Sequence, residues 1–308
     1  MRAAQIGSYG GPEVLALVEV EPPTPAEGEI LLEVATSSIN PADVAVRSGW
    51  MAAYLPMSPP LTLGVDVAGT VAAVGPGVSG LAPGDRVFGV AGIPTGGSGA
   101  FAELAVTPAS CLAPAPERTG LVVAGTLSLA GVAAVQALTE TLGVEAGTRL
   151  LVHGGAGGVG LFAVDLARHL GAEVVATARR TGVGFLADLG VEVVDTDGTD
   201  PTTLKPFDAT LDLVGEDPEL PVRATAPGGR AASLIVVPSP ELAAERDVAV
   251  SLQPTEVTTE RLEQLTRYVE EGVLTPRVVA SYHLDEVAAA FDRKAAGGVH
   301  GKLGITVR

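Results

Sequence analysis

The sequence predicts an α/β protein of two domains, one β-rich and one built on a parallel, doubly wound sheet. The first observation is length, because 308 residues exceed the ~250–300 at which one hydrophobic core stops growing. The second is a series of short strand patterns between Gly and Pro turns in residues 1–118. The third is an alternation of strand and helix patterns in residues 119–258, which is typical of a parallel sheet.

The β-rich part is predicted from strands at 29–36, 65–74 and 86–90. The second strand is followed by Gly75-Pro76-Gly77, and Pro83-Gly84-Asp85 forms a turn before the third. Strands separated by turns at this spacing predict a compact barrel or sandwich.

The parallel sheet is predicted from five apolar runs that alternate with helical patterns. The expected strands are 149–153, 173–178, 191–194, 209–214 and 231–237. Helices are expected at 161–170 and 184–189, each ended by the glycine that follows it.

The tail predicts two more helices and a final strand at 303–307. Thr259 is a candidate N-cap for a helix through residue 271, and Asp285 for a second one. We expect residues 259–308 to rejoin the 1–118 domain, which leaves 119–258 as the second domain.

Composition excludes several function classes. The net charge of −17 disfavours nucleic acid and anionic membrane surfaces as partners. The single cysteine, Cys111, forbids an internal disulfide and any zinc site with two thiolates, and we expect it to be a buried apolar residue. Residues 121–138 carry no charge, but their small and polar residues predict a helix buried between two domains rather than a membrane span. No signal-peptide pattern opens the chain, so we expect a cytoplasmic protein.

A glycine-rich segment provides the clearest functional signal. It has the spacing G-x-G-x-x-G between a buried strand and a helix, and a second strand follows at 173. Small residues let backbone N–H groups approach a pyrophosphate, which the helix N-terminus stabilises. The predicted dinucleotide-binding residues are Gly155, Ala156, Gly157, Gly158, Val159 and Gly160.

The end of the second strand indicates which dinucleotide is bound. NAD sites usually place Asp or Glu there to bind the ribose hydroxyls. Here the strand ends with Thr177-Ala178, and Arg179-Arg180 follow. Paired guanidiniums bind a 2′-phosphate by charge-assisted hydrogen bonds, so the sequence favours NADPH.

The order of motifs resembles the zinc-independent medium-chain dehydrogenase/reductases, and most closely their quinone oxidoreductase, or zeta-crystallin-like, branch. The first element is Asn40-Pro41-Ala42-Asp43 with Arg47-Ser48-Gly49. The others are 63–71, 83–87, 153–160, 227–230 and Gly301-Lys302.

This resemblance implies a GroES-like catalytic domain, a Rossmann domain and an NADPH cofactor in the cleft. It also implies hydride transfer to a quinone or another activated α,β-unsaturated carbonyl. Zinc-dependent relatives have Cys where Asn40 stands and His-Glu where Val65-Asp66 stand, so no metal is expected. Asp247–Leu252 matches the strand through which the family commonly forms homodimers.

Asn40 is the predicted catalytic residue, as a hydrogen-bond donor to the substrate oxygen or the nicotinamide ribose. Asp43 and Arg47 are expected to pair and hold the loop, and Trp50 and Tyr54 are expected to line the substrate pocket. The predicted further cofactor contacts are Thr177, Val214, Leu234, Ile235, Val236 and Lys302. Two polar positions of the family differ here, where Ala133 replaces a Thr and Thr196 a Tyr.

Two other functions stay open at this point. One is an enoyl reductase acting on an α,β-unsaturated ketone or thioester in a biosynthetic pathway. The other is an NADPH-binding protein with little catalysis, because the two substituted positions remove polar groups from the expected site.

Overall fold

The computed structural model describes all of residues 1–308, which form two compact units. The first unit comprises Met1–Leu129, Val257–Glu270 and Val278–Arg308, and the second comprises Ala130–Glu256 and Glu271–Arg277. The sequence-based boundary at 118 differs from this division, in which 119–129 belong to the first unit.

The first unit is β-rich, with one three-stranded and one seven-stranded sheet. Its strands are β1 (Arg2–Ile6), β2 (Leu15–Glu19), β3 (Glu29–Ser38), β4 (Leu61–Thr62), β5 (Asp66–Val74), β6 (Arg86–Val90), β7 (Leu104–Pro108), β8 (Leu112–Pro114), β15 (Val278–His283) and β16 (Lys302–Thr306). Its helices are α1 (Pro41–Arg47), α2 (Leu121–Ala124), α8 (Thr259–Glu270) and α9 (Val287–Ala295).

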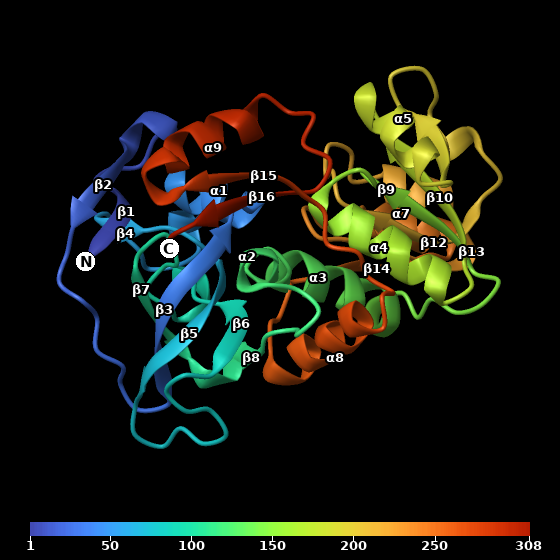
Figure 1. Ribbon diagram of the computed structural model, residues 1–308. Helices are drawn as coiled ribbons and strands as arrows, with labels where there is room; N and C mark the ends of the chain where they lie inside the picture. The colour runs from blue at the N-terminus through green and yellow to red at the C-terminus, as the bar shows by residue number, and fades with distance from the viewer. The chain divides into compact units, whose positions relative to one another are not determined.

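Strand β3 organises the larger sheet. One of its edges pairs with β5, and the other pairs first with β7 and then with β16. The C-terminal strands β15 and β16, red in Figure 1, therefore complete a sheet begun by the blue N-terminal strands. This arrangement brings Lys302 to Ser38 and Asn40, from which the chain enters α1.

The second unit has one fully parallel sheet of six strands in the order β11-β10-β9-β12-β13-β14 (Figure 1). These strands are β9 (Arg149–His153), β10 (Glu173–Ala178), β11 (Glu192–Asp195), β12 (Phe207–Asp212), β13 (Thr225–Ser233) and β14 (Ala249–Leu252). The helices between them are α4 (Gly158–His169), α5 (Thr181–Asp188), α6 (Leu220–Ala224) and α7 (Pro240–Arg246). The strand order reverses between β9 and β12, and such reversals are where doubly wound sheets bind ligands.

The uncharged run at 121–138 is two helices rather than one. Helix α2 ends at Ala124, and α3 (Ser128–Val135) continues into a π-helical turn, Gln136–Thr141. The break lies at Gly125, where a Cβ atom would come within 2.5 Å of the Thr36 carbonyl oxygen. Gln136 satisfies its buried amide by donating to the carbonyl of Pro254 and accepting from the N–H of Glu256. No helix in the structure has the length and apolar character needed to cross a membrane.

Candidate active site

The glycine turn between β9 and α4 has no room for side chains at two positions. A Cβ atom on Gly155 would lie 2.6 Å from the Ala176 Cβ on β10, and one on Gly160 would lie 2.5 Å from the carbonyl oxygen of Gly154. Gly154 itself has φ +90, a left-handed conformation that glycine adopts without strain. The glycines therefore let α4 start directly against the end of β9.

The start of α4 forms a cradle suited to a phosphate group. Gly157 is the N-cap, and no side chain caps the helix, so the first amide N–H groups are open to a ligand. A Cβ atom on Gly157 would meet only the Gly154 carbonyl oxygen, at an ordinary contact distance of 3.5 Å. These features fit the pyrophosphate of a dinucleotide, as the spacing predicted.

A buried polar network supports this turn from below. The Thr177 hydroxyl accepts from the N–H of Gly154 and lies 2.8 Å from His153 Nδ1. Burial lowers the pKa of His153 below its ordinary value, against the opposing effect of the Asp212 carboxylate. Burial therefore favours the neutral form of His153, which packs beneath the turn, and Thr177 holds the turn through its hydroxyl.

Asp212 and Ser233 fix the loops that follow β12 and β13. One Asp212 oxygen accepts from the N–H groups of Val214 and Gly215, and the other accepts from the Ser233 hydroxyl. Ser233 in turn accepts from the N–H groups of Ile235 and Val236. Strand β13 ends at Ser233, so the predicted contacts Leu234, Ile235 and Val236 lie on a loop rather than in the expected strand through 237. Sequence reasoning missed Asp212, although its place at a strand end marks it as a loop-positioning carboxylate.

The two arginines predicted to bind a 2′-phosphate follow β10. Arg180 has φ +51, so this turn is held in a conformation that L-residues rarely adopt. Arg179 is half-exposed, and its Nη2 lies 2.6 Å from Glu216 Oε2, while its Nε lies 4.0 Å from Asp197 Oδ1. The hydrogen bond that Arg179 donates to the Glu216 carboxylate raises the pKa of Arg179 above its ordinary value.

A second polar cluster lies in the first unit, around Asn40. The Asn40 amide donates to Asp66 Oδ2 at 2.8 Å, and its carbonyl oxygen accepts from Lys302 Nζ. Lys302 also lies 3.1 Å from Asp66 Oδ2, and Ser38 donates to the same oxygen. The other Asp66 oxygen accepts from the N–H of Leu129.

This cluster is buried. Asn40 is 2 % exposed, Lys302 5 % and Asp66 0 %. Lys302 was predicted to contact cofactor phosphates, but its ammonium is engaged by Asn40 and Asp66. Sequence reasoning missed Asp66 as a member of the site, although it stands in the conspicuous segment 63–71.

The expected pair between Asp43 and Arg47 is wrong. The Asp43 carboxylate instead accepts from the backbone N–H groups of Asn40 and Gly64, at 2.8 and 3.0 Å. Burial raises the pKa of Asp43 to about 7, and the nearby Asp66 carboxylate acts in the same direction. Arg47 lies over the ring of Phe291, 5.1 Å from its centroid, and Nε and one terminal nitrogen have no hydrogen-bond partner. The loop is therefore held by backbone hydrogen bonds and ring packing.

Trp50 and Tyr54, the predicted substrate-pocket residues, form an exposed aromatic pair. Their ring centroids are 5.0 Å apart, and the residues are 61 % and 70 % exposed. Asn40 of the buried cluster is the N-cap of α1, and Trp50 and Tyr54 lie in the segment that follows the other end of this helix.

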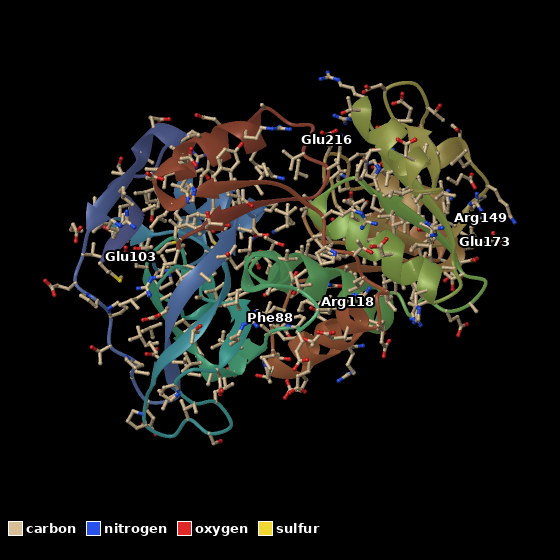
Figure 2. The ribbon with its side chains drawn as sticks, in the orientation of Figure 1. Phe88, Glu103, Arg118, Arg149, Glu173 and Glu216 are labelled. Carbon is tan, nitrogen blue, oxygen red and sulfur yellow. The ribbon has the colours of Figure 1, made fainter.

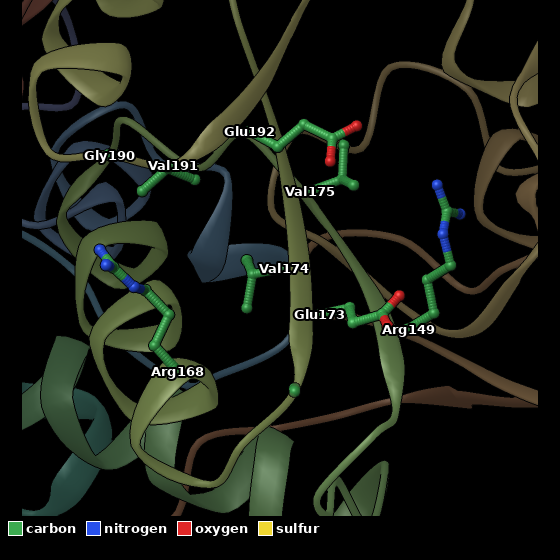
Figure 3. Close-up of a pocket in the computed structure, with 9 residues that line it drawn as sticks. Arg149, Arg168, Glu173, Val174, Val175, Gly190, Val191 and Glu192 are labelled. Atoms are coloured by element: carbon green, nitrogen blue, oxygen red, sulfur yellow. The ribbon is translucent and has the colours of Figure 1, made fainter.

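A surface depression of about 340 Å³ lies at the other end of the parallel sheet. It is lined by the charged residues Arg149, Arg168, Glu173 and Glu192 (Figure 3). Arg149 donates to the carbonyl of Lys205, and Arg168 to that of Leu189. Arg149, Glu173 and Glu192 begin β9, β10 and β11, whereas the glycine turn follows the opposite end of β9. The depression is therefore separate from the cradle.

The chain brings together no group of three or more His, Cys, Asp or Glu side chains suited to a metal ion. Cys111 is partly buried, not fully as expected, and burial raises the pKa of its thiol.

Two segments of the chain match models of known protein families. Residues 26–117 match the family model of the alcohol dehydrogenase GroES-like domain, and residues 189–303 match that of the zinc-binding dehydrogenases. A chloroplast envelope quinone oxidoreductase homolog from Arabidopsis thaliana is 31% identical over 98% of this chain and 97% of its own. The quinone oxidoreductase of Sus scrofa is 37% identical over 58% of this chain and 53% of its own.

Solved structures give the same result. A quinone oxidoreductase from Coxiella burnetii superposes with a TM-score of 0.92 at 30% identity, covering 100% of this chain and 99% of that one. A mycobacterial protein solved as a complex with NADPH has a TM-score of 0.88 at 27% identity, with both chains covered completely. A protein described as an NAD-dependent alcohol dehydrogenase has a TM-score of 0.87 at 30% identity, again with complete coverage. With its GroES-like unit, its parallel Rossmann sheet and these relatives, the chain belongs to the quinone oxidoreductase-like branch of the medium-chain dehydrogenase/reductase family of oxidoreductases.

Proposed function

We propose that this oxidoreductase uses NADPH to reduce quinones or other activated α,β-unsaturated carbonyls, without zinc. The observation that carries the proposal is the uncapped α4 N-terminus with Arg179 and Arg180, rather than an acid, after β10. One structural relative was solved with NADPH, which supports the choice of cofactor.

In this proposal the second unit binds the cofactor through its backbone and its arginines. The N–H groups at the start of α4 bind the pyrophosphate, and the two guanidiniums bind the 2′-phosphate. Val214 and the loop Leu234, Ile235 and Val236 contact the rest of the cofactor, because Asp212 and Ser233 hold their backbone in place. Bound NADPH would supply the hydride.

Asn40 carries the proposed catalytic role in the first unit. Lys302 and Asp66 fix its amide in one orientation, since the carbonyl oxygen faces the ammonium and the NH₂ group faces the carboxylate. An amide has two donor hydrogens, and Asp66 takes one of them in a short hydrogen bond. Nδ2 makes only a long contact of 3.5 Å with the Ser38 carbonyl oxygen, so in this proposal its second hydrogen is the one offered to a developing substrate oxygen.

The donor set around Asn40 does not resemble a zinc site. Zinc prefers thiolate and imidazole ligands, whereas the groups here are an amide, an ammonium, a hydroxyl and one carboxylate. The Lys302 ammonium already binds the Asp66 carboxylate, so a divalent cation would have to displace it to use that carboxylate as a ligand. These contacts support a reaction that needs no metal.

A homodimer through Asp247–Leu252 remains part of the proposal. Within this segment β14 is the outer strand of the sheet, and its far edge pairs with no strand of the chain. An unpaired edge is suited to continuing the sheet into a second copy. Light scattering of the wild type and of a variant with Leu252→Pro would test it. The N–H of Gln253 donates to Ser233 on β13, so the N–H of Leu252, one residue earlier, faces the free edge, and proline removes that donor.

The cofactor and the acceptor are tested in sequence. NADPH and NADH are titrated into the wild type and an Arg179→Ala, Arg180→Ala variant, with nicotinamide fluorescence as the signal. Tighter binding of NADPH, lost in the variant, supports the proposal, whereas equal binding of both cofactors contradicts it. NADPH oxidation is then followed with a simple quinone, an enone and a crotonyl-type thioester. Turnover only of the thioester would favour the enoyl reductase, and tight binding without turnover would favour a non-catalytic protein.

A further inference from the structure

Arg179 is bound by an acidic residue from the other side of the glycine turn. Arg179 follows β10 and Glu216 follows β12, and β9 lies between these two strands. Arg179 Nη2 lies 2.6 Å from Glu216 Oε2. The ion pair therefore crosses the carboxyl end of β9, where the glycine turn begins at Gly154. Glu216 is labelled in Figure 2, at the opposite end of this unit from Arg149 and Glu173.

The backbone before Glu216 is held by hydrogen bonds and close packing. The N–H groups of Val214 and Gly215 both donate to the buried Asp212 carboxylate, which is 1 % exposed. Gly215 has φ +72, and a Cβ there would lie 2.3 Å from the Ile235 side chain. The residue that follows therefore leaves the turn in a set direction, toward Arg179.

The local charge is close to balanced around the two arginines. Glu216 lies at hydrogen-bond distance from Arg179, and Asp197 Oδ1 lies 4.0 Å from its Nε. The other acids of the same loop are engaged elsewhere, since Asp217 and Glu219 bind Arg223 at 2.6 and 2.8 Å. A 2′-phosphate entering this site must therefore displace the Glu216 carboxylate and is repelled by it, whereas an uncharged ribose 2′-hydroxyl is not.

We propose that Glu216 is a specificity-determining residue that narrows the preference for NADPH over NADH by competing with the 2′-phosphate for Arg179. This inference rests on the proposed binding of the 2′-phosphate by Arg179.

The test is the affinity of each cofactor for Glu216→Gln, which removes the charge and keeps the shape. We expect NADPH to bind about two- to five-fold more tightly, the range that an exposed ion pair supports, and NADH to bind no more tightly than before. Glu219→Gln is the matched control, because it makes the same change in the same loop at a residue that pairs with Arg223. It should change NADPH binding clearly less than Glu216→Gln does.

The same change in an Arg179→Ala background separates the two proposals. If Glu216 acts through Arg179, Glu216→Gln has little effect once the arginine is gone. An equal gain with and without Arg179, an equal gain for both cofactors, or no gain at all would overturn the inference. If Arg179→Ala itself leaves NADPH affinity unchanged, the proposed 2′-phosphate site is wrong instead.

Discussion

Three residues far apart in sequence, Asn40, Asp66 and Lys302, share one buried cluster. Taking a carboxylate and an ammonium out of water costs several kcal/mol each, by order of magnitude, and is offset only when both are fully hydrogen-bonded. Here Asp66 accepts from Ser38, Asn40, Lys302 and the N–H of Leu129. The cluster is thus satisfied as a whole, and each member depends on the others.

Removing the Lys302 ammonium alone should therefore lower the free energy of unfolding more than removing the Lys302 and Asp66 charges together. We expect Lys302→Met to lower the free energy of unfolding by about 3–5 kcal/mol, because it leaves Asp66 buried without its cation. The double variant Lys302→Met, Asp66→Asn should recover part of that loss, as measured by urea unfolding. Additive losses in this cycle would show that the two charges do not interact.

Asp43 should make stability depend on pH. Its pKa is raised to about 7 in the folded chain, against an ordinary value of 3.8, so the folded state holds a proton that the unfolded state releases. The free energy of unfolding then falls as pH rises from about 4 to about 7, by up to ~1.4 kcal/mol per pH unit from this one group. Asp43→Asn should remove this slope, because the amide does not titrate, so the difference in stability between variant and wild type should itself change between about pH 4 and about pH 7. An unchanged slope in the variant would assign the pH dependence to other groups.

At the scale of an element, the strand–turn–helix formed by β9 and α4 forms the proposed pyrophosphate site. Its glycines differ in what a side chain would meet: a Cβ atom on Gly155 or Gly160 would clash at 2.5–2.6 Å, whereas one on Gly157 would make only an ordinary contact of 3.5 Å. The spacing of the motif is therefore a packing requirement at Gly155 and Gly160, and Gly157 begins the helix whose N-terminus we propose binds the pyrophosphate.

Gly160→Ala and Gly184→Ala form a matched pair of helix substitutions. The first puts a Cβ 2.5 Å from a backbone oxygen, so we expect a loss of about 1–3 kcal/mol in stability and a marked loss of cofactor binding. The second meets nothing within 4 Å and lies within α5, so it should raise stability by about 0.5–1 kcal/mol. Thermal unfolding with and without NADPH measures both. Tolerance of alanine at both positions would contradict the packing argument.

Over the whole molecule, the first unit depends on the last residues of the chain. Phe291 on α9 is 2 % exposed and packs edge-to-face against Phe101, with centroids 6.2 Å apart. Ile305 on β16 belongs to the same core cluster as Ile30 and Leu32 on β3. The residues that complete the first unit therefore come after most of the second unit in the sequence.

Phe291→Ala should destabilise the N-terminal strands although they are remote in sequence. Truncating a fully buried phenylalanine costs about 3–5 kcal/mol. Hydrogen exchange should show the loss of protection in β1, β3 and β5 as well as in the tail. Val279→Ala, an exposed position in the same tail, is the control and should change stability by less than about 0.5 kcal/mol. Exchange changes restricted to residues after 278 would contradict this dependence.

The amino-acid sequence by itself determined the two-domain fold, most strands of the parallel sheet and a nicotinamide dinucleotide as the class of cofactor. The strands Arg86–Val90, Arg149–His153 and Glu173–Ala178 and the glycine turn have the predicted bounds, because local patterns of apolar residues and glycine specify them. Helix α4 starts three residues before the predicted 161, since its first turn consists of the glycines themselves.

Only the tertiary structure decided which polar groups meet. The Asp43 carboxylate accepts from the backbone N–H of Gly64 and does not pair with Arg47. Lys302 pairs with Asp66. Glu216 pairs with Arg179 across the end of β9. Such partners lie up to hundreds of residues apart, and their choice depends on strand order and register, which leave no periodic trace in the sequence. The local sequence therefore indicates which type of site to expect. Which charged groups pair in that site depends on contacts between distant segments that only folding brings together.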